Sequence, residues 1–137
     1  MARSIVGVVI AVVAAMFVAA GFERVAGVAA PLADGVRPTA VYQLLIAVGW
    51  AASAFVAAAI ALFVGRRWAP IGGLASASIG LLAVQGLAAG GLAWWMWPLS
   101  LAGVAAGGYG AVRVLKAPSD PNVALRPKRE GGSSLFK

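Results

Sequence analysis

Residues 41–64, VYQLLIAVGWAASAFVAAAIALFV, are almost entirely apolar, with Gln43 and Ser53 as polar residues and no charged side chain. A helix needs about 20 apolar residues to cross a hydrocarbon core of about 30 Å. Three further apolar runs lie at about residues 4–22, 68–89 and 95–115. Continuous runs of this length are typical of spanning helices, since barrel strands alternate apolar and polar residues. The sequence therefore predicts an all-α integral membrane protein with four transmembrane helices in a small bundle.

The composition of the 137-residue chain also points to lipid as its solvent. Hydrophobic residues make up 62% of the chain and charged residues 11%, whereas about 25% of a soluble domain is charged. A soluble protein of this size needs more polar side chains to cover its surface. We expect a four-helix transmembrane domain over residues 1–116 and a basic, Pro- and Gly-rich tail over residues 117–137. Alone, the tail is predicted to be disordered, because it has no apolar pattern.

The first apolar run also has features of a signal peptide. Arg3 precedes it, and the small residues Val18-Ala19-Ala20 near its end resemble a cleavage site. Its apolar core is longer than the usual 7–15 residues of a signal peptide. This length favours a retained first helix.

Lys and Arg residues collect on one side of the predicted bundle. One precedes the first helix, two lie between the second and third, and six lie at or beyond the end of the fourth. The opposite side carries Arg24 and Arg37, offset by Glu23 and Asp34. Because basic segments are retained in the cytoplasm, we expect both termini to be cytoplasmic and the membrane to be a bacterial inner membrane.

The residue types that are missing limit the chemistry of the chain. It has no Cys and no His, and its acids are Glu23, Asp34, Asp120 and Glu130. This inventory excludes thiol and imidazole chemistry and offers no carboxylate cluster for a divalent cation. We therefore expect no enzyme activity, no catalytic residue, no cofactor and no metal.

The net charge of +7 follows from topology and lipid contact without any nucleic acid. Basic residues near a membrane surface gain about 1 kcal/mol each from anionic headgroups, and no aromatic platform for stacking bases accompanies the tail. The residues assigned to lipid or partner contact are Arg113, Lys116, Arg126, Lys128 and Arg129.

Most aromatic residues fall at predicted helix ends, where amphipathic rings favour the headgroup level. The predicted interfacial residues are Tyr42, Trp68, Trp94, Trp95 and Trp97. Trp50 differs, because it falls about 13 Å inside the second helix at 1.5 Å per residue. Its ring is expected to face lipid, a neighbouring helix, or a bound hydrophobic molecule such as a pigment.

Small residues recur at helical spacing within the apolar runs. Helices in lipid associate through close backbone approach, which small residues allow. The predicted packing residues are Gly49, Ser53, Ala57, Ala61 and Gly65 on the second helix, Gly72, Ser76 and Gly80 on the third, and Gly103 and Gly107 on the fourth. A chain rich in Ala and Gly also produces such spacing by chance. We assign the stripes to packing inside the bundle first and to a partner subunit second.

Three polar residues, Glu23, Gln43 and Gln85, approach the outer face in the predicted topology. Buried amides need hydrogen-bond partners, so these residues can form a structural network or a shallow ligand site. The structural network is the favoured interpretation, because one acid near the interface does not require a function.

Taken together, these patterns favour a non-catalytic accessory or structural subunit of a larger respiratory, photosynthetic or transport assembly in the membrane. Its expected partners are lipids and larger membrane subunits, with a homo-oligomer possible and no nucleic acid. The alternative is a small homo-oligomeric transporter or channel, since four helices and this length suit the small multidrug resistance transporters. The acid that such a proton-coupled exporter needs inside its first helix is not found there, because Glu23 comes at its predicted outer end.

Overall fold

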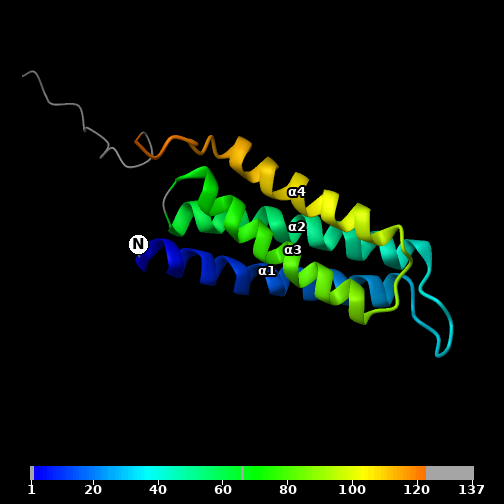
Figure 1. The fold of residues 1–137 in the computed structure, drawn as a ribbon. Helices are drawn as coiled ribbons and strands as arrows, with labels where there is room; N and C mark the ends of the chain where they lie inside the picture. Colours follow the sequence, from blue (N-terminus) through cyan, green and yellow to red (C-terminus); the bar gives the residue numbers. More distant parts are fainter. Residues whose placement is uncertain (1, 66, 123–137) are drawn as a thin grey trace, which may run out of the picture.

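A computed structural model describes residues 2–65 and 67–122 of the chain. These residues form four helices and no strand, so the all-α prediction is confirmed for them. The helices are α1 (Ala2–Ala29), α2 (Ala40–Val64), α3 (Ala69–Ala89) and α4 (Met96–Val114). They run lengthwise beside one another in a bundle, with the N-terminal end of α1 and the C-terminal end of α4 at the same end (Figure 1).

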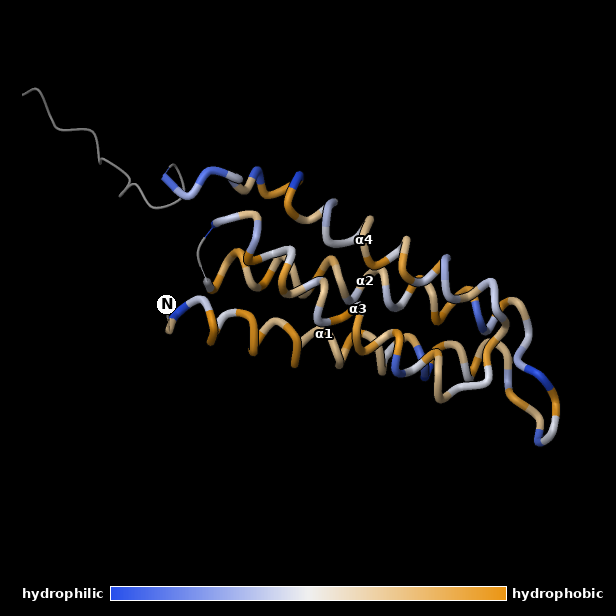
Figure 2. Tube along the Cα trace, viewed as in Figure 1, coloured by the Kyte–Doolittle hydropathy of each residue, from blue (hydrophilic) through white to orange (hydrophobic). Residues whose placement is uncertain are grey.

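Three of the helices, α1, α2 and α3, are long and apolar enough to span a membrane. At 1.5 Å per residue they measure about 42, 38 and 32 Å, against a hydrocarbon core of about 30 Å. The apolar residues follow the lengths of the helices, and much of the most polar chain lies at the ends of the bundle (Figure 2). These lengths and compositions are compatible with an integral membrane protein.

Helix α4 is shorter, with 19 residues, and it is not among the helices that meet this length and hydropathy. Its sequence contains Trp97, Pro98, Tyr109 and Arg113 together with several glycines. These residues lower its hydropathy relative to the Val-, Ile- and Ala-rich helices before it. The length and hydropathy of α4 alone therefore do not mark it as a fourth span.

Helix α1 extends seven residues past Phe22, where the sequence pattern placed its end. The first proline after this point is Pro31, and Ala26 is fully buried in a small cluster with Ile46, Leu87 and Met96. Packing of Ala26 therefore keeps the chain helical beyond the two charged residues Glu23 and Arg24. As a consequence, Glu23 lies inside α1, about 9 Å before its last residue.

Helix α2 is the centre of the bundle, because it makes the most extensive contacts with the other three helices. Helix α1 packs mainly on α2 and less on α3, and within the described residues it makes no contact with α4. Helix α4 packs on α2 and α3. Accordingly, α1 and α4 lie on opposite sides of the bundle (Figure 1).

Local signals fix where α2, α3 and α4 begin. The Thr39 hydroxyl accepts a hydrogen bond from the Tyr42 backbone N–H at 3.3 Å and caps α2. Pro70 lies in the first turn of α3 and Pro98 in the first turn of α4, where a missing N–H costs little. The connection before α4 turns at Gly91, whose φ of +59° is easily adopted by glycine.

The chain that follows α4 is tied to the start of α3. The Pro118 carbonyl accepts a hydrogen bond from the Ala69 N–H at 3.0 Å, and the Ser119 carbonyl accepts one from the Trp68 indole at 3.2 Å. The first part of the predicted tail is therefore held against the bundle. The rest of the tail, with Arg126, Lys128 and Arg129, lies outside the described residues.

Candidate functional site

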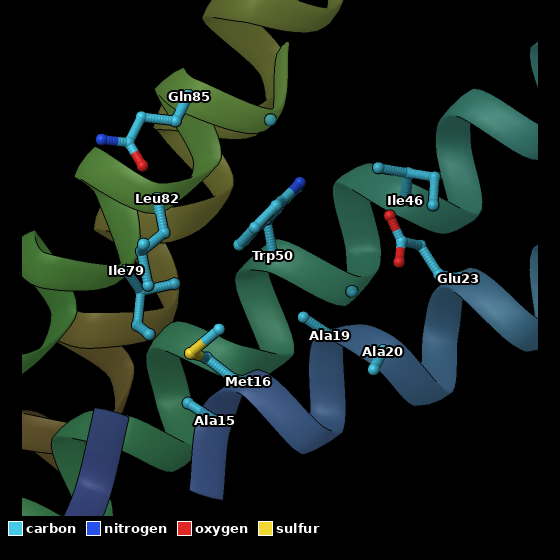
Figure 3. Close-up of a pocket in the computed structure, with 12 residues that line it drawn as sticks. Ala15, Met16, Ala19, Ala20, Glu23, Ile46, Trp50, Ile79, Leu82 and Gln85 are labelled. Carbon is cyan, nitrogen blue, oxygen red and sulfur yellow. The ribbon is translucent and has the colours of Figure 1, made fainter. Parts of the chain in front are cut away.

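An open cavity of about 310 Å³ lies between α1, α2 and α3. Figure 3 shows Trp50 of α2 between the other two helices, with Glu23 of α1 on one side and Gln85 of α3 on the other. The remaining lining residues are small or apolar: Ala15, Met16, Ala19 and Ala20 from α1, Ile46 and Gly49 from α2, and Ile79, Leu82 and Gly86 from α3. The site therefore combines an apolar wall with one carboxylate, one amide and one indole.

The cavity exists because small residues of α1 face a bulky ring on α2. On α2, a Cβ added at Gly49 would lie 2.6 Å from the Phe22 Cβ, so α1 and α2 approach closely at this level. On the other side, a Cβ added at Gly86 would lie 3.3 Å from the Trp50 ring, so the indole packs against the α3 backbone. The alanines of α1 do not reach across the remaining space. The close α1–α2 approach and the Trp50 ring thus define the walls of the cavity.

A second hollow of about 140 Å³ lies toward the α1–α2 loop and shares part of this lining. Glu23, Ile46, Trp50 and Gly86 border both spaces. The second hollow is closed by residues of the loops and helix ends, among them Leu32, Pro38, Tyr42 and Leu92. Glu23 and Trp50 therefore face two adjacent spaces at the end of the bundle that carries these loops.

Glu23 and Gln85 are both solvent-exposed in the isolated chain, at the open side of the cavity. Within the described residues no ion pair is recorded, so no Lys or Arg nitrogen of that part of the chain lies within 4.0 Å of the Glu23 carboxylate. Its neighbour Arg24 does not line the cavity. The carboxylate is thus the one charged group among the lining residues.

The structure brings two of the three predicted polar residues to this cavity and leaves out Gln43. That side chain is buried, and its Nε2 donates a hydrogen bond to the Pro38 carbonyl at 2.8 Å. Gln43 lies two helical turns before Trp50, at the level where the α1–α2 loop covers α2. Its Oε1 is buried without a hydrogen-bond partner. The expected convergence of Glu23, Gln43 and Gln85 is therefore corrected to Glu23 and Gln85.

The predicted packing residues lie at helix contacts or next to them. Ser53, Ala57 and Ala61 are fully buried, and Ser53 donates a hydrogen bond to the Gly49 carbonyl at 2.7 Å. A Cβ added at each of several glycines would meet a neighbouring helix: Gly49 meets Phe22, Gly72 meets Leu62 and Val112, Gly80 meets Val104, Gly103 meets Ala51, and Gly107 meets the Ala51 carbonyl. Ser76 is buried beside Gly108. Gly65 caps α2, outside the helix itself.

Sequence reasoning missed two close contacts. A Cβ added at Gly7 would lie 2.8 Å from the Gly65 backbone nitrogen, so α1 meets the end of α2 there. Gly108 packs against Ser76 of α3. Gly7, Ala11, Ala15 and Ala19 recur at four-residue spacing and were a usable signal for the first contact, although its partner lies far along the chain. The Gly107-Gly108 pair in the sequence was a usable signal for the second contact.

The aromatic and basic residues are distributed over both ends of the bundle. Trp94 is 81% exposed, while Tyr42, Trp95 and Trp97 pack against the cluster that holds Ala26 and Met96. Trp68 precedes α3 and donates to Ser119. Arg113 lies over the Tyr109 ring at 5.9 Å, and Lys116 is exposed after α4. Their contacts with lipid headgroups stay predictions.

No protein-family model, curated protein or solved structure matches the chain. Within the described residues, no group of three or more His, Cys, Asp or Glu side chains could hold a metal ion. Charge, an aromatic face and apolar contact are the means by which the cavity can hold a ligand.

Proposed function

We propose that α4 crosses the membrane together with the other three helices. Gly103 and Gly107 of α4 approach Ala51 of α2, which lies near the middle of the Ala40–Val64 helix. Gly108 approaches Ser76 of α3. A helix that packs on the middle of two spanning helices shares their depth in the bilayer. Its short length and its glycines suit a helix that is held in lipid by close packing.

The proposed orientation places both termini in the cytoplasm of a bacterial cell, with the chain in the inner membrane. Arg3, Arg67, Arg113 and Lys116 belong to the end of the bundle that carries the N-terminus (Figure 1). The Arg3 Nε also donates a hydrogen bond to the Val64 carbonyl at 3.1 Å. Support for this orientation comes from the excess of basic residues at that end.

The function that we propose is that of a non-catalytic accessory subunit in a larger membrane assembly. The observation that carries it is a set of exposed apolar residues at the outer end of α1 and the following loop: Val25, Val28, Leu32 and Val36. Residues 3–23 already extend over about 30 Å, the thickness of the hydrocarbon core. Val28 lies beyond this span and is 83% exposed. Exposed apolar groups outside the lipid favour coverage by a partner protein.

The test is purification from native membranes in mild detergent, followed by native mass spectrometry. We expect larger, stoichiometric subunits to co-purify with the chain. Val28→Ser combined with Leu32→Ser should reduce their recovery, whereas Val114→Ser, the same change at an exposed site at the other end of the bundle, should not. A homodimer without other subunits that moves ions or drugs in proteoliposomes would contradict the accessory function.

That last outcome defines the second candidate, a small homo-oligomeric transporter or channel. The observation in its favour is the open cavity that Glu23 and Gln85 line. In addition, Glu23 lies within α1, at the outer limit of the segment that covers the hydrocarbon core. Acids within spanning helices commonly serve ion or substrate pathways. Flux that depends on this protein in proteoliposomes would support this candidate over the first.

A further inference from the structure

We propose that the cavity between α1, α2 and α3 binds a small organic cation, in which an ammonium group is attached to an apolar body. This inference goes beyond the accessory function and does not depend on it. It rests on the volume of the cavity, on the single charge at its mouth, and on the ring of Trp50.

The volume fits a small molecule. The cavity holds about 310 Å³, at the lower end of the range of about 300–1,000 Å³ that small-molecule sites occupy. Its wall is mainly aliphatic, from Met16, Ile46, Ile79 and Leu82. Most ligand pockets have such a wall with a few polar groups that fix orientation. A ligand of modest size with an apolar body would fill this space.

The charge at the mouth selects a cation. Glu23 is the one charged residue that lines the cavity, and within the described residues it has no ion-pair partner within 4.0 Å. The other charged residues near this end, Arg24, Asp34 and Arg37, do not line the space. A lipid tail would fill the volume and leave the carboxylate without a counter-charge. A cationic group satisfies both the charge and the space.

Trp50 supplies the second recognition element. Its ring is half-buried, borders both hollows, and stands between Glu23 and Gln85 in Figure 3. Tryptophan is the aromatic side chain that attracts cations most strongly through its face. The part of the ring that the helices leave uncovered borders this open space, where a cationic group could approach it.

The binding test uses the full chain in nanodiscs of phosphatidylglycerol, which has no ammonium headgroup. Benzyltrimethylammonium is the probe, and benzylsulfonate is the matched anion with the same ring. The indole N–H resonance of Trp50, assigned with Trp50→Phe, reports binding. We expect a saturable shift with the cation and none with the anion. Equal shifts with both probes, or a shift with neither, would overturn the proposal.

Two variants separate the Glu23 carboxylate from the general surface charge. Glu23→Gln should weaken binding of the cation about tenfold, whereas Asp34→Asn, which removes an acid from the loop at the same end, should leave it unchanged. Equal weakening by both would mean that the surface potential alone attracts the probe, which contradicts the proposal. If Glu23→Gln does not fold, Ala19→Phe provides the test, because it fills the cavity and should abolish the Trp50 shift. Binding unaffected by Ala19→Phe would place the probe elsewhere.

A lipid headgroup could supply the same ammonium chemistry, so the source is tested separately. Nanodiscs of phosphatidylglycerol are doped with a minor fraction of either phosphatidylethanolamine or uncharged diacylglycerol, which keeps the surface charge the same. We expect benzyltrimethylammonium to bind with the same affinity in the two kinds of nanodisc, because the proposed site takes its cation from solution. Weaker binding only with phosphatidylethanolamine would show that the site holds a lipid headgroup and would overturn the proposed ligand.

Discussion

At the scale of single residues, glycine positions set how closely the helices approach one another. Gly7 and Gly21 both lie in α1, but only Gly7 faces a neighbouring backbone. A Cβ added at Gly7 would lie 2.8 Å from the Gly65 nitrogen, while nothing lies within 4 Å of one added at Gly21. Backbone atoms cannot move aside as a flexible side chain can. A side chain introduced at Gly7 would therefore disturb helix packing, whereas one introduced at Gly21 would not.

The first prediction compares alanine substitutions at these two sites. Gly7→Ala should lower the free energy of unfolding in detergent by about 1–3 kcal/mol, the usual cost of overpacking a close contact. Gly21→Ala should be neutral or slightly stabilising, since alanine is favoured over glycine inside a helix by about 0.5–1 kcal/mol. Thermal unfolding followed by circular dichroism measures both. Equal stability of the two variants would mean that α1 does not meet the end of α2.

At the scale of elements, α4 depends on packing more than on hydropathy for its place in the bundle. Its glycines bring its backbone against α2 near Ala51, and Gly108 brings it against Ser76 of α3. Gly110 has a different environment, because a Cβ there would be 3.8 Å from the Phe55 ring, an ordinary contact. The face of α4 that approaches α2 is therefore centred on Gly103 and Gly107.

The second prediction concerns the docking of this helix. Gly107→Ala should push α4 away from the Ala51 carbonyl and increase hydrogen exchange of the α4 amides, while those of α2 change less. Gly110→Ala is the matched control and should leave exchange unchanged. The physical reason is that association in lipid comes from close van der Waals packing and not from a hydrophobic drive. Unchanged exchange in Gly107→Ala would place α4 away from α2.

At the scale of the whole molecule, charge and packing divide the bundle into two different ends. One end carries Arg3, Arg67, Arg113 and Lys116, and the other carries the α1–α2 loop, Trp94 and the hollow beside Glu23. The described part after α4 joins the first end through Pro118 and Ser119. The cavity between α1, α2 and α3 and the exposed apolar residues of the α1–α2 loop therefore lie toward the end opposite Arg3, Arg67, Arg113 and Lys116.

The third prediction tests the proposed orientation of these ends. A reporter that is active only in the cytoplasm should be active when it is fused after Lys137, because the basic end is expected to stay inside. A reporter that needs export should be active when it is inserted at Gly35, in the α1–α2 loop. The reverse pattern of activities would overturn both the orientation and the cytoplasmic termini.

The sequence pattern predicted four apolar helices, and the described residues form four helices, of which three have the length and hydropathy of membrane spans. In lipid the backbone must satisfy its own hydrogen bonds, so a long apolar run such as residues 41–64 has few alternatives to a helix. The end of α1 could not be read in this way. Ala26 packs against Ile46, Leu87 and Met96, and the helix continues to Ala29. Because these partners lie far from Ala26 along the chain, the sequence around residue 26 shows no pattern that predicts the contact.

Which residues share a site follows from the packing of the helices. Glu23 and Gln85 come together because α1 and α3 both flank Trp50, while the α1–α2 loop covers Gln43 and engages its amide. The cavity itself depends on alanines of α1 that lie opposite one large ring. In lipid, helices pair where their side-chain surfaces pack closely. Whether two helices far apart in the sequence pack closely depends on their three-dimensional shapes, which the order of residues in either helix does not show.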